Sequence, residues 1–102
     1  MKEGLFITLE GVEGAGKTTL VDFIENLLVK SGYDVVKTRE PGGTKIGEQI
    51  REILLKNENN KLTSDTELLL IFSARAQHIK EVIIPSLSSG KTVLCDRFTD
   101  AS

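Results

Sequence analysis

Residues 11–18 read Gly11-Val12-Glu13-Gly14-Ala15-Gly16-Lys17-Thr18 and match the phosphate-loop pattern G-x-x-x-x-G-K-[ST] in full. The stretch lies between an apolar run typical of a strand and the start of an amphipathic helix, as such a loop requires. Backbone N–H groups, the helix dipole and the Lys17 charge would together hold the phosphates of a nucleoside triphosphate. A flexible glycine turn is the alternative, but it needs neither the lysine nor the fixed gap. The predicted nucleotide-binding residues are Gly11, Val12, Glu13, Gly14, Ala15, Gly16, Lys17, Thr18 and Thr19.

Extended and helical patterns alternate along the chain, which favours the α/β fold class. The patterns predict strands over residues 5–10, 34–39 and 92–96, and helices over about 17–31, 46–54 and 64–84. Right-handed crossovers would make one parallel sheet flanked by helices, of the P-loop NTPase type. Asp96 is expected near Thr18, so strand three must lie beside strand one. The predicted strand order is therefore 2-3-1.

The third predicted helix has a clear start and a disturbed end. Ser64 and Glu67 are spaced as a capping box, in which each side chain satisfies a backbone N–H group at the helix start. Pro85 must kink or restart the helix, because its ring clashes with the preceding turn. His78 is expected on the helix surface, since nothing near it in the sequence resembles a metal or base arrangement.

Charged residues stand at the carboxyl ends of the predicted strands, where ligands bind in parallel sheets. Asp96 can hold Mg²⁺ there together with the Thr18 hydroxyl, although it could instead cap the next turn. Arg39 and Arg97 are expected to face the same crevice. Two guanidinium groups would suit bidentate recognition of an acceptor phosphate.

Arg75 lies in the most apolar part of the third predicted helix, where an unpaired guanidinium would cost several kcal/mol. It either reaches solvent or lines a polar pocket with a partner. Ile71 and Phe72 lie four and three positions before it, so one of them could stack on a flat ligand. Phe72 is the predicted contact, although an aromatic residue here is more often part of the core.

Glu13 is the unusual member of the loop, because a carboxylate that pointed inward would repel a triphosphate. It either accepts a hydrogen bond from a sugar hydroxyl of a second substrate or is solvated at the loop tip. Cys95, the single cysteine, lies in an apolar run and is expected to be a buried small hydrophobe.

The composition describes an ordinary globular chain. The 102 residues suit one domain, with 39% apolar residues, 27% charged residues and a net charge of −2. No basic face is implied, so binding to a nucleic-acid polymer is not expected. No apolar run suits a membrane span or a signal peptide, so no membrane partner is expected. Together with the single cysteine, which favours a reducing compartment, this predicts a cytoplasmic protein.

The residues together resemble the thymidylate kinase family over the whole chain. The resemblance rests on LEGVEGAGKTT at 9–19, TREPGG at 38–43, ARAQH at 74–78 and DRF at 96–98. The TREPGG segment is the specific one, since many folds share a phosphate loop. The resemblance implies that residues 1–102 are the N-terminal part of a single P-loop kinase domain. Such a kinase moves the γ-phosphoryl group of ATP onto thymidine monophosphate with Mg²⁺, giving thymidine diphosphate and ADP, and is expected to be a homodimer.

The resemblance also implies roles at the donor side of the site. Lys17 and the loop backbone would hold the donor phosphates, and Thr18 and Asp96 would serve Mg²⁺. The implied catalytic residues are Lys17, Asp96 and Arg97.

At the acceptor side the resemblance implies that Glu13 meets the deoxyribose 3′-hydroxyl and that Arg75 meets the thymine edge. Arg39 and Arg97 would hold the monophosphate. When the family pattern is aligned on Arg75, its stacking aromatic residue falls at Ile71 rather than at Phe72. Either Phe72, at the next position, takes over this role, or the stacking contact is lost.

A second departure, in length, leaves other interpretations open. Members of the family are about twice as long as these residues. Some members carry an arginine in the phosphate loop where this sequence has Gly14. Others supply that arginine from a lid, which falls outside these residues. The alternatives are a truncated nucleotide-binding module without turnover and another P-loop nucleoside or nucleotide kinase.

Overall fold

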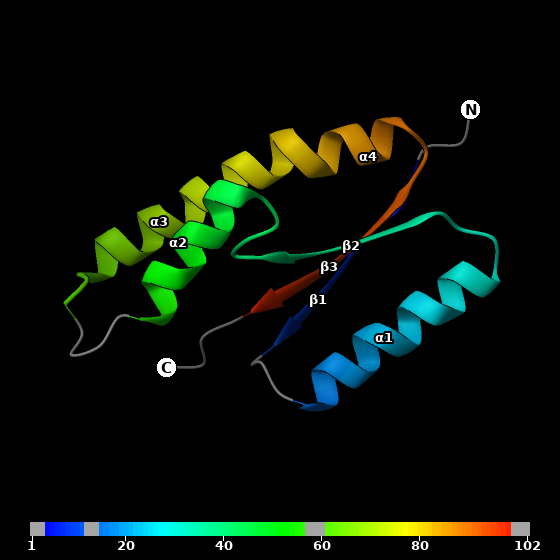
Figure 1. The fold of residues 1–102 in the computed structure, drawn as a ribbon, viewed down its shortest axis with the longest axis horizontal. Helices are drawn as coiled ribbons and strands as arrows, with labels where there is room; N and C mark the ends of the chain where they lie inside the picture. The colour runs from blue at the N-terminus through cyan, green and yellow to red at the C-terminus, as the bar shows by residue number, and fades with distance from the viewer. Residues whose placement is uncertain (1–3, 12–14, 57–60, 99–102) are drawn as a thin grey trace.

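The structure is a computed structural model that describes residues 4–11, 15–56 and 61–98. Figure 1 shows a sheet with one helix on one side and the remaining helices on the other, which confirms the α/β class. In chain order the elements are β1 (Phe6–Gly11), α1 (Ala15–Lys30), β2 (Val35–Glu40), α2 (Lys45–Leu55), α3 (Ser64–His78), the π-helical turn η2 (Ile79–Ile83), α4 (Ile84–Ser88) and β3 (Thr92–Phe98). The predicted strands and helices lie within a few residues of these bounds.

The sheet is parallel and its strands lie in the order β1-β3-β2, so the predicted order is confirmed. In the β2–β3 register Arg39 pairs with Asp96, and Glu40 pairs with Arg97. Side chains that pair across neighbouring strands project from the same face, and successive residues project from opposite faces. Arg39 and Asp96 therefore share the face covered by α1, while Glu40 and Arg97 share the face covered by α3.

The centre of the core is strand β3. Val93, Leu94 and Cys95 are 0% exposed, as expected of a central parallel strand that is covered on both faces. The predicted burial of Cys95 is confirmed. Burial raises the pKa of its thiol to about 12, so at neutral pH the sulfur is an unreactive thiol rather than a thiolate.

Helix α3 begins one residue earlier than the predicted capping box requires. Thr63 is the N-cap: its hydroxyl accepts a hydrogen bond from the Thr66 N–H group at 3.1 Å. Ser64 is already helical, so the prediction that Ser64 caps the helix is wrong. Serine and threonine are both favoured N-cap residues, and sequence spacing alone does not distinguish two neighbouring hydroxyl residues.

The helix changes its geometry after His78 and before Pro85. The N–H group of Ile84 bonds to the carbonyl oxygen of Ile79, five residues back, which closes the π-helical turn. A second α-helix, α4, then begins at Ile84 with Pro85 in its first turn. Pro85 has no N–H group to donate and its ring crowds the preceding turn. The predicted restart of the helix is thus confirmed.

The turn that follows β2 connects the sheet to α2. Thr44 caps α2, since its hydroxyl accepts a hydrogen bond from the Gly47 N–H group at 2.8 Å. Gly43 has φ +84°, and a Cβ atom at this position would lie 2.7 Å from the Thr38 hydroxyl and closer still to the His78 ring. Only glycine fits this turn without displacing β2 or α3. Among the described residues, no helix combines the length and apolarity that a membrane crossing needs.

Candidate nucleotide and phosphate site

Lys17 lies at the carboxyl end of the sheet and has three oxygen partners there. Its Nζ atom donates to the carbonyl oxygens of Gly11 at 3.1 Å and Arg97 at 3.2 Å, and it lies 2.8 Å from Oδ1 of Asp96. The side chain is only 10% exposed. Lys17 therefore links the start of α1 to the ends of β1 and β3, at the position where the phosphate loop leaves the sheet.

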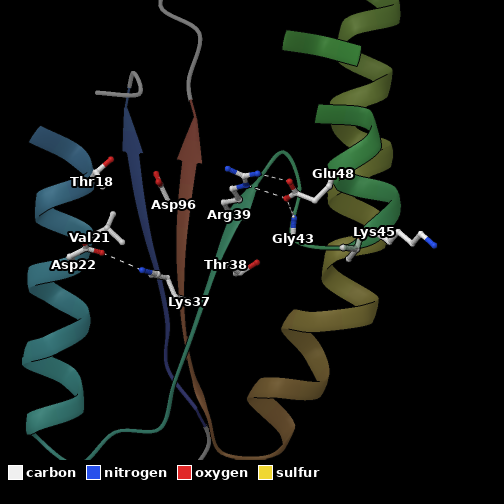
Figure 2. Close-up of a pocket in the computed structure, with 11 residues that line it drawn as sticks. Thr18, Val21, Asp22, Lys37, Thr38, Arg39, Gly43, Lys45, Glu48 and Asp96 are labelled. Atoms are coloured by element: carbon white, nitrogen blue, oxygen red, sulfur yellow. Dashed lines mark hydrogen bonds and ion pairs between the residues drawn. The ribbon is translucent and has the colours of Figure 1, made fainter. Parts of the chain in front are cut away.

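A pocket of about 520 Å³ opens beside Lys17 on the face of the sheet that α1 covers, and we call it the α1 pocket. Figure 2 shows the Thr18 hydroxyl and the Asp96 carboxylate lining it from α1 and β3. A hydroxyl and a carboxylate are oxygen ligands of the kind that Mg²⁺ prefers. The donor set therefore fits Mg²⁺. The pocket is lined by Thr18, Val21, Asp22, Lys37, Thr38, Arg39, Gly43, Thr44, Lys45, Glu48 and Asp96.

Arg39 is held at the rim of the α1 pocket by Glu48 of α2 (Figure 2). Its Nε atom donates to Oε2 of Glu48 at 3.1 Å, and Nη2 donates to Oε1, so the contact is bidentate. The Gly43 N–H group also donates to Oε2, at 2.9 Å. The hydrogen bonds from Arg39 are the main reason that the pKa of Glu48 falls to about 2. Glu48 is therefore ionised at neutral pH and fixes both Arg39 and the turn.

A second pocket, of about 360 Å³, lies on the opposite face of the sheet, and we call it the α3 pocket. Its wall combines apolar side chains with three arginines, a mixture that suits a flat ligand carrying a phosphate. The wall contributed by α3 consists of Glu67, Ile71 and Arg75, which are spaced four residues apart and so share one side of the helix. The other lining residues are Glu10, Glu40, Pro41, Arg51, Leu54, Leu55 and Arg97.

Glu40 is the centre of a buried polar network behind the α3 pocket. Its Oε1 atom accepts a hydrogen bond from Nε of Arg75 at 2.9 Å and lies 3.3 Å from Nε of Arg97. Its Oε2 atom lies 2.8 Å from Nδ1 of His78, and Nε2 of His78 lies 2.7 Å from the Thr38 hydroxyl. Glu40 and His78 are 4% and 0% exposed. A buried carboxylate is stable only when its oxygens are paired in this way.

The pKa of Glu40 reflects two opposing effects. Burial raises the pKa of this carboxyl group, but the hydrogen bonds from His78 and Arg75 and the charges of Arg75 and Arg97 outweigh burial and hold it below the ordinary value. Glu40 is therefore a carboxylate at neutral pH. Because a carboxylate only accepts hydrogen bonds, the Nδ1 atom of His78 carries the proton that faces it.

The structure separates two arginines that the sequence predicted to face one crevice. Arg39 lines the α1 pocket and Arg97 lines the α3 pocket, so the prediction that they face one crevice is wrong. The reason is the register of the sheet: Arg97 pairs with Glu40, one residue beyond Arg39, and successive residues face opposite sides. The two guanidinium groups approach the carboxyl edge of the sheet from its two faces.

The structure also distinguishes the two neighbours on α3. Ile71 lines the α3 pocket with Arg75, whereas Phe72 is 52% exposed and is not among its lining residues. Arg75 has its partner in Glu40, which agrees with the pocket alternative and not with a side chain that extends into solvent. Val12, Glu13 and Gly14 of the predicted nucleotide-binding set lie outside the described residues.

Three residues of the site were not predicted from the sequence. The sequence patterns end the second predicted strand at residue 39 and give Glu40 no role. They also place His78 at the helix surface, which is wrong because His78 is completely buried. Arg51 of α2 is also buried and donates from Nη1 to the Pro41 carbonyl oxygen at 3.0 Å. One signal was available: a guanidinium in an apolar helix requires an acid, and Glu40 stands at the end of a neighbouring strand.

Comparisons with known proteins agree with this geometry. The family model described as thymidylate kinase matches residues 9–102. Proteins named thymidylate kinase from Vesicomyosocius okutanii subsp. Calyptogena okutanii (strain HA) and Hahella chejuensis (strain KCTC 2396) are 60% and 56% identical over 102 residues. A crystal structure of thymidylate kinase from Ehrlichia chaffeensis superposes with a TM-score of 0.80 at 44% identity, covering 94% of this chain and 54% of that one.

The extent of the match is uneven. All 102 residues align with these two curated relatives, but they cover only 50% and 49% of the relatives' own lengths. The chain therefore spans about half the length of the curated relatives it matches.

Proposed function

The chain belongs to the thymidylate kinase family, and on this basis we propose that the protein transfers the γ-phosphoryl group of ATP to thymidine monophosphate, giving thymidine diphosphate and ADP. One observation carries the proposal. Nζ of Lys17, the lysine of the phosphate loop, donates to the backbone carbonyl oxygen of Arg97, whose side chain lines the α3 pocket. A donor site at the loop and an acceptor site in the α3 pocket would thus meet at one point of β3.

We assign the donor side to the loop and its lysine. Lys17 would leave the Asp96 carboxylate and bind the β and γ phosphates, while Thr18 and Asp96 would hold Mg²⁺, which neutralises phosphate charge when bound. The oxygen atoms that line the α1 pocket support this assignment. Of the loop residues that are described, Gly11 ends β1, and Ala15, Gly16, Lys17, Thr18 and Thr19 lie in the first turns of α1.

We assign the acceptor side to the α3 pocket. Thymidine monophosphate would place its base against Ile71 with Arg75 at the base edge, and Arg97 would hold its phosphate near Lys17. Arg39 would reach the same phosphate from the other face of the sheet, and Glu13 would meet the deoxyribose. The mixed apolar and arginine lining supports this assignment. Phosphoryl transfer needs little covalent help, so positioning and charge neutralisation would supply most of the rate.

Three broader proposals come with the family. Residues 1–102 would belong to one kinase domain, the protein would be cytoplasmic, and the full-length protein would be a homodimer. The homodimer is supported by Leu68, Leu69 and Phe72 of α3, three large apolar side chains that are more than half exposed. Sedimentation of the full-length protein would test it, and a monomer at micromolar concentration would contradict it.

The proposed function is tested by turnover in the full-length protein. ATP, Mg²⁺ and thymidine monophosphate should give equal amounts of ADP and thymidine diphosphate, separated by ion-exchange chromatography. Uridine, cytidine and guanosine monophosphates serve as competing acceptors. Preferred phosphorylation of another acceptor would contradict the substrate assignment, and ATP binding without any product would indicate a binding module.

A further inference from the structure

Two of the three arginines that line the α3 pocket contact the carboxylate of Glu40. Arg75 comes from α3 and Arg97 from β3, and Nε atoms of both approach Oε1 of Glu40, at 2.9 Å and 3.3 Å. Because both arginines use Nε, these contacts leave the Nη ends, which carry most of the N–H donors, oriented away from Glu40. One oxygen atom of Glu40 thus contacts both guanidinium groups, while Nη1 of Arg97 also lies 3.6 Å from Oε1 of Glu10.

The other oxygen of Glu40 is fixed independently. Nδ1 of His78 holds Oε2 at 2.8 Å, and the Thr38 hydroxyl holds the far side of the ring at 2.7 Å. Thr38 and Glu40 project from the same face of β2, and His78 comes from the last turn of α3. The carboxylate is therefore held from the strand and from the helix at once, and it cannot rotate without breaking a buried hydrogen bond.

From these contacts we propose that Glu40 is the positioning residue of the α3 pocket, which orients Arg75 and Arg97 toward a nucleoside monophosphate, with His78 and Thr38 fixing its carboxylate. The proposal rests on the proposed function in that Arg75 and Arg97 bind the acceptor. Glu40 does not touch the acceptor in this assignment. Its effect passes through the orientation of the two guanidinium groups, so it should act on the acceptor and not on ATP.

The test is Glu40→Gln in the full-length protein, which keeps the size of the side chain and removes its charge. The KM for thymidine monophosphate, and its Kd by calorimetry, should rise at least about tenfold, while the KM for ATP changes less than about twofold. Glu81→Gln is the matched control, because Glu81 is an exposed acid in η2, directly after α3, and accepts a hydrogen bond from Gln77 at 3.1 Å. It should leave both constants unchanged.

Thr38→Val keeps the proposal testable if Glu40→Gln folds poorly. It removes the hydroxyl that holds the His78 ring but leaves the Glu40 charge in place. It should raise the KM for thymidine monophosphate a few-fold, without changing that for ATP, at temperatures well below the melting midpoint. A lower melting temperature with both KM values unchanged would show a purely structural role and would overturn the proposal.

Turnover by the wild type tests the proposed function, and the two variants test the positioning role of Glu40. If the wild-type protein does not phosphorylate thymidine monophosphate, the proposed function is wrong. If it does, and Glu40→Gln and Thr38→Val bind this nucleotide as the wild type does, the positioning role of Glu40 is wrong and the function stands.

Discussion

Lys17 and Asp96 form an ion pair of 2.8 Å that joins the first turn of α1 to the end of β3. Both side chains belong to the set proposed for the donor site, and in this structure each neutralises the other. Nucleotide and metal binding would replace this pair with two stronger ones, because the lysine would face phosphate and the carboxylate would face Mg²⁺.

Lys17→Ala should weaken ATP binding by about ten- to a hundredfold, because it removes a charged hydrogen-bond donor from the phosphates. Binding of thymidine monophosphate should change little. Calorimetry of the full-length protein with each nucleotide measures both affinities. Lys30→Ala, at the exposed end of the same helix, is the control and should change neither.

Asp96→Asn should remove most of the gain in ATP affinity that Mg²⁺ provides, because the neutral amide is a poor ligand for a hard cation. ATP titrations with Mg²⁺ and with EDTA give this gain for the wild type and the variant. Asp65→Asn, in the exposed first turn of α3, is the matched control. An unchanged gain in Asp96→Asn would place the metal elsewhere.

Arg39→Ala should weaken thymidine monophosphate binding and leave ATP binding nearly unchanged. Arg97→Ala, from the other face of the sheet, should have the same selectivity. Comparing the two variants by calorimetry tests whether guanidinium groups from two pockets serve one phosphate. Equal losses for both nucleotides in Arg39→Ala alone would assign Arg39 to the donor site, together with Thr18 and Asp96.

Glu48 should make stability depend on pH. Its folded-state pKa is lowered to about 2, so its contribution is complete above the ordinary value of 4.5 and is lost as the pH falls toward 2. The difference in unfolding free energy between the wild type and Glu48→Gln should therefore shrink between about pH 5 and about pH 2. Because this carboxylate is 40% exposed, the difference should stay below about 1 kcal/mol.

Urea unfolding at several pH values measures this effect. The same comparison in an Arg39→Gln background is the control, since it removes the main cause of the lowered pKa. A pH dependence that persists there would show that Arg39 is not responsible.

Gly43→Ala should destabilise the fold by at least about 2 kcal/mol, because the new methyl group would overlap the His78 ring and the Thr38 hydroxyl. Gly32→Ala is the matched control. Gly32 also has a positive φ, +95°, but a Cβ atom there would meet nothing within 4 Å. It should cost only the backbone term of about 1 kcal/mol. Equal losses in urea unfolding would mean that packing at Gly43 is unimportant.

Local sequence patterns predicted the fold well. The phosphate loop, the apolar runs and the helix break at Pro85 each depend on residues that are close in the sequence, and these predict the elements and their order along the chain. The misplaced cap at Ser64 is an error of one residue between two hydroxyl side chains. Such local signals suffice for elements but leave their bounds uncertain by a residue or more.

The candidate site was only partly predictable, because its contacts are not local. His78 lies 38 residues from Glu40 in the sequence, and an isolated helical histidine gives no sign of a buried carboxylate partner. The separation of Arg39 from Arg97 depends on the register between β2 and β3, which no single strand specifies. Phe72 was preferred over Ile71 for its aromatic ring, but the spacing of four residues between Ile71 and Arg75 decides which side chain lines the pocket.

The register of β2 against β3 determines which side chains project from each face of the sheet. The α1 pocket and the α3 pocket, on opposite faces, therefore differ in chemistry. Arg39 and Asp96 project from the face with the α1 pocket, and Glu40 and Arg97 project from the face with the α3 pocket. Each face therefore carries one arginine and one carboxylate. Inserting one residue in β2 would move Arg39 to the position of Glu40 beside His78, and deleting one residue would move Glu40 to the position of Arg39 opposite Asp96. Such a change would alter both pockets at once, so single-residue length changes in this strand should be far less tolerated than substitutions at its exposed positions.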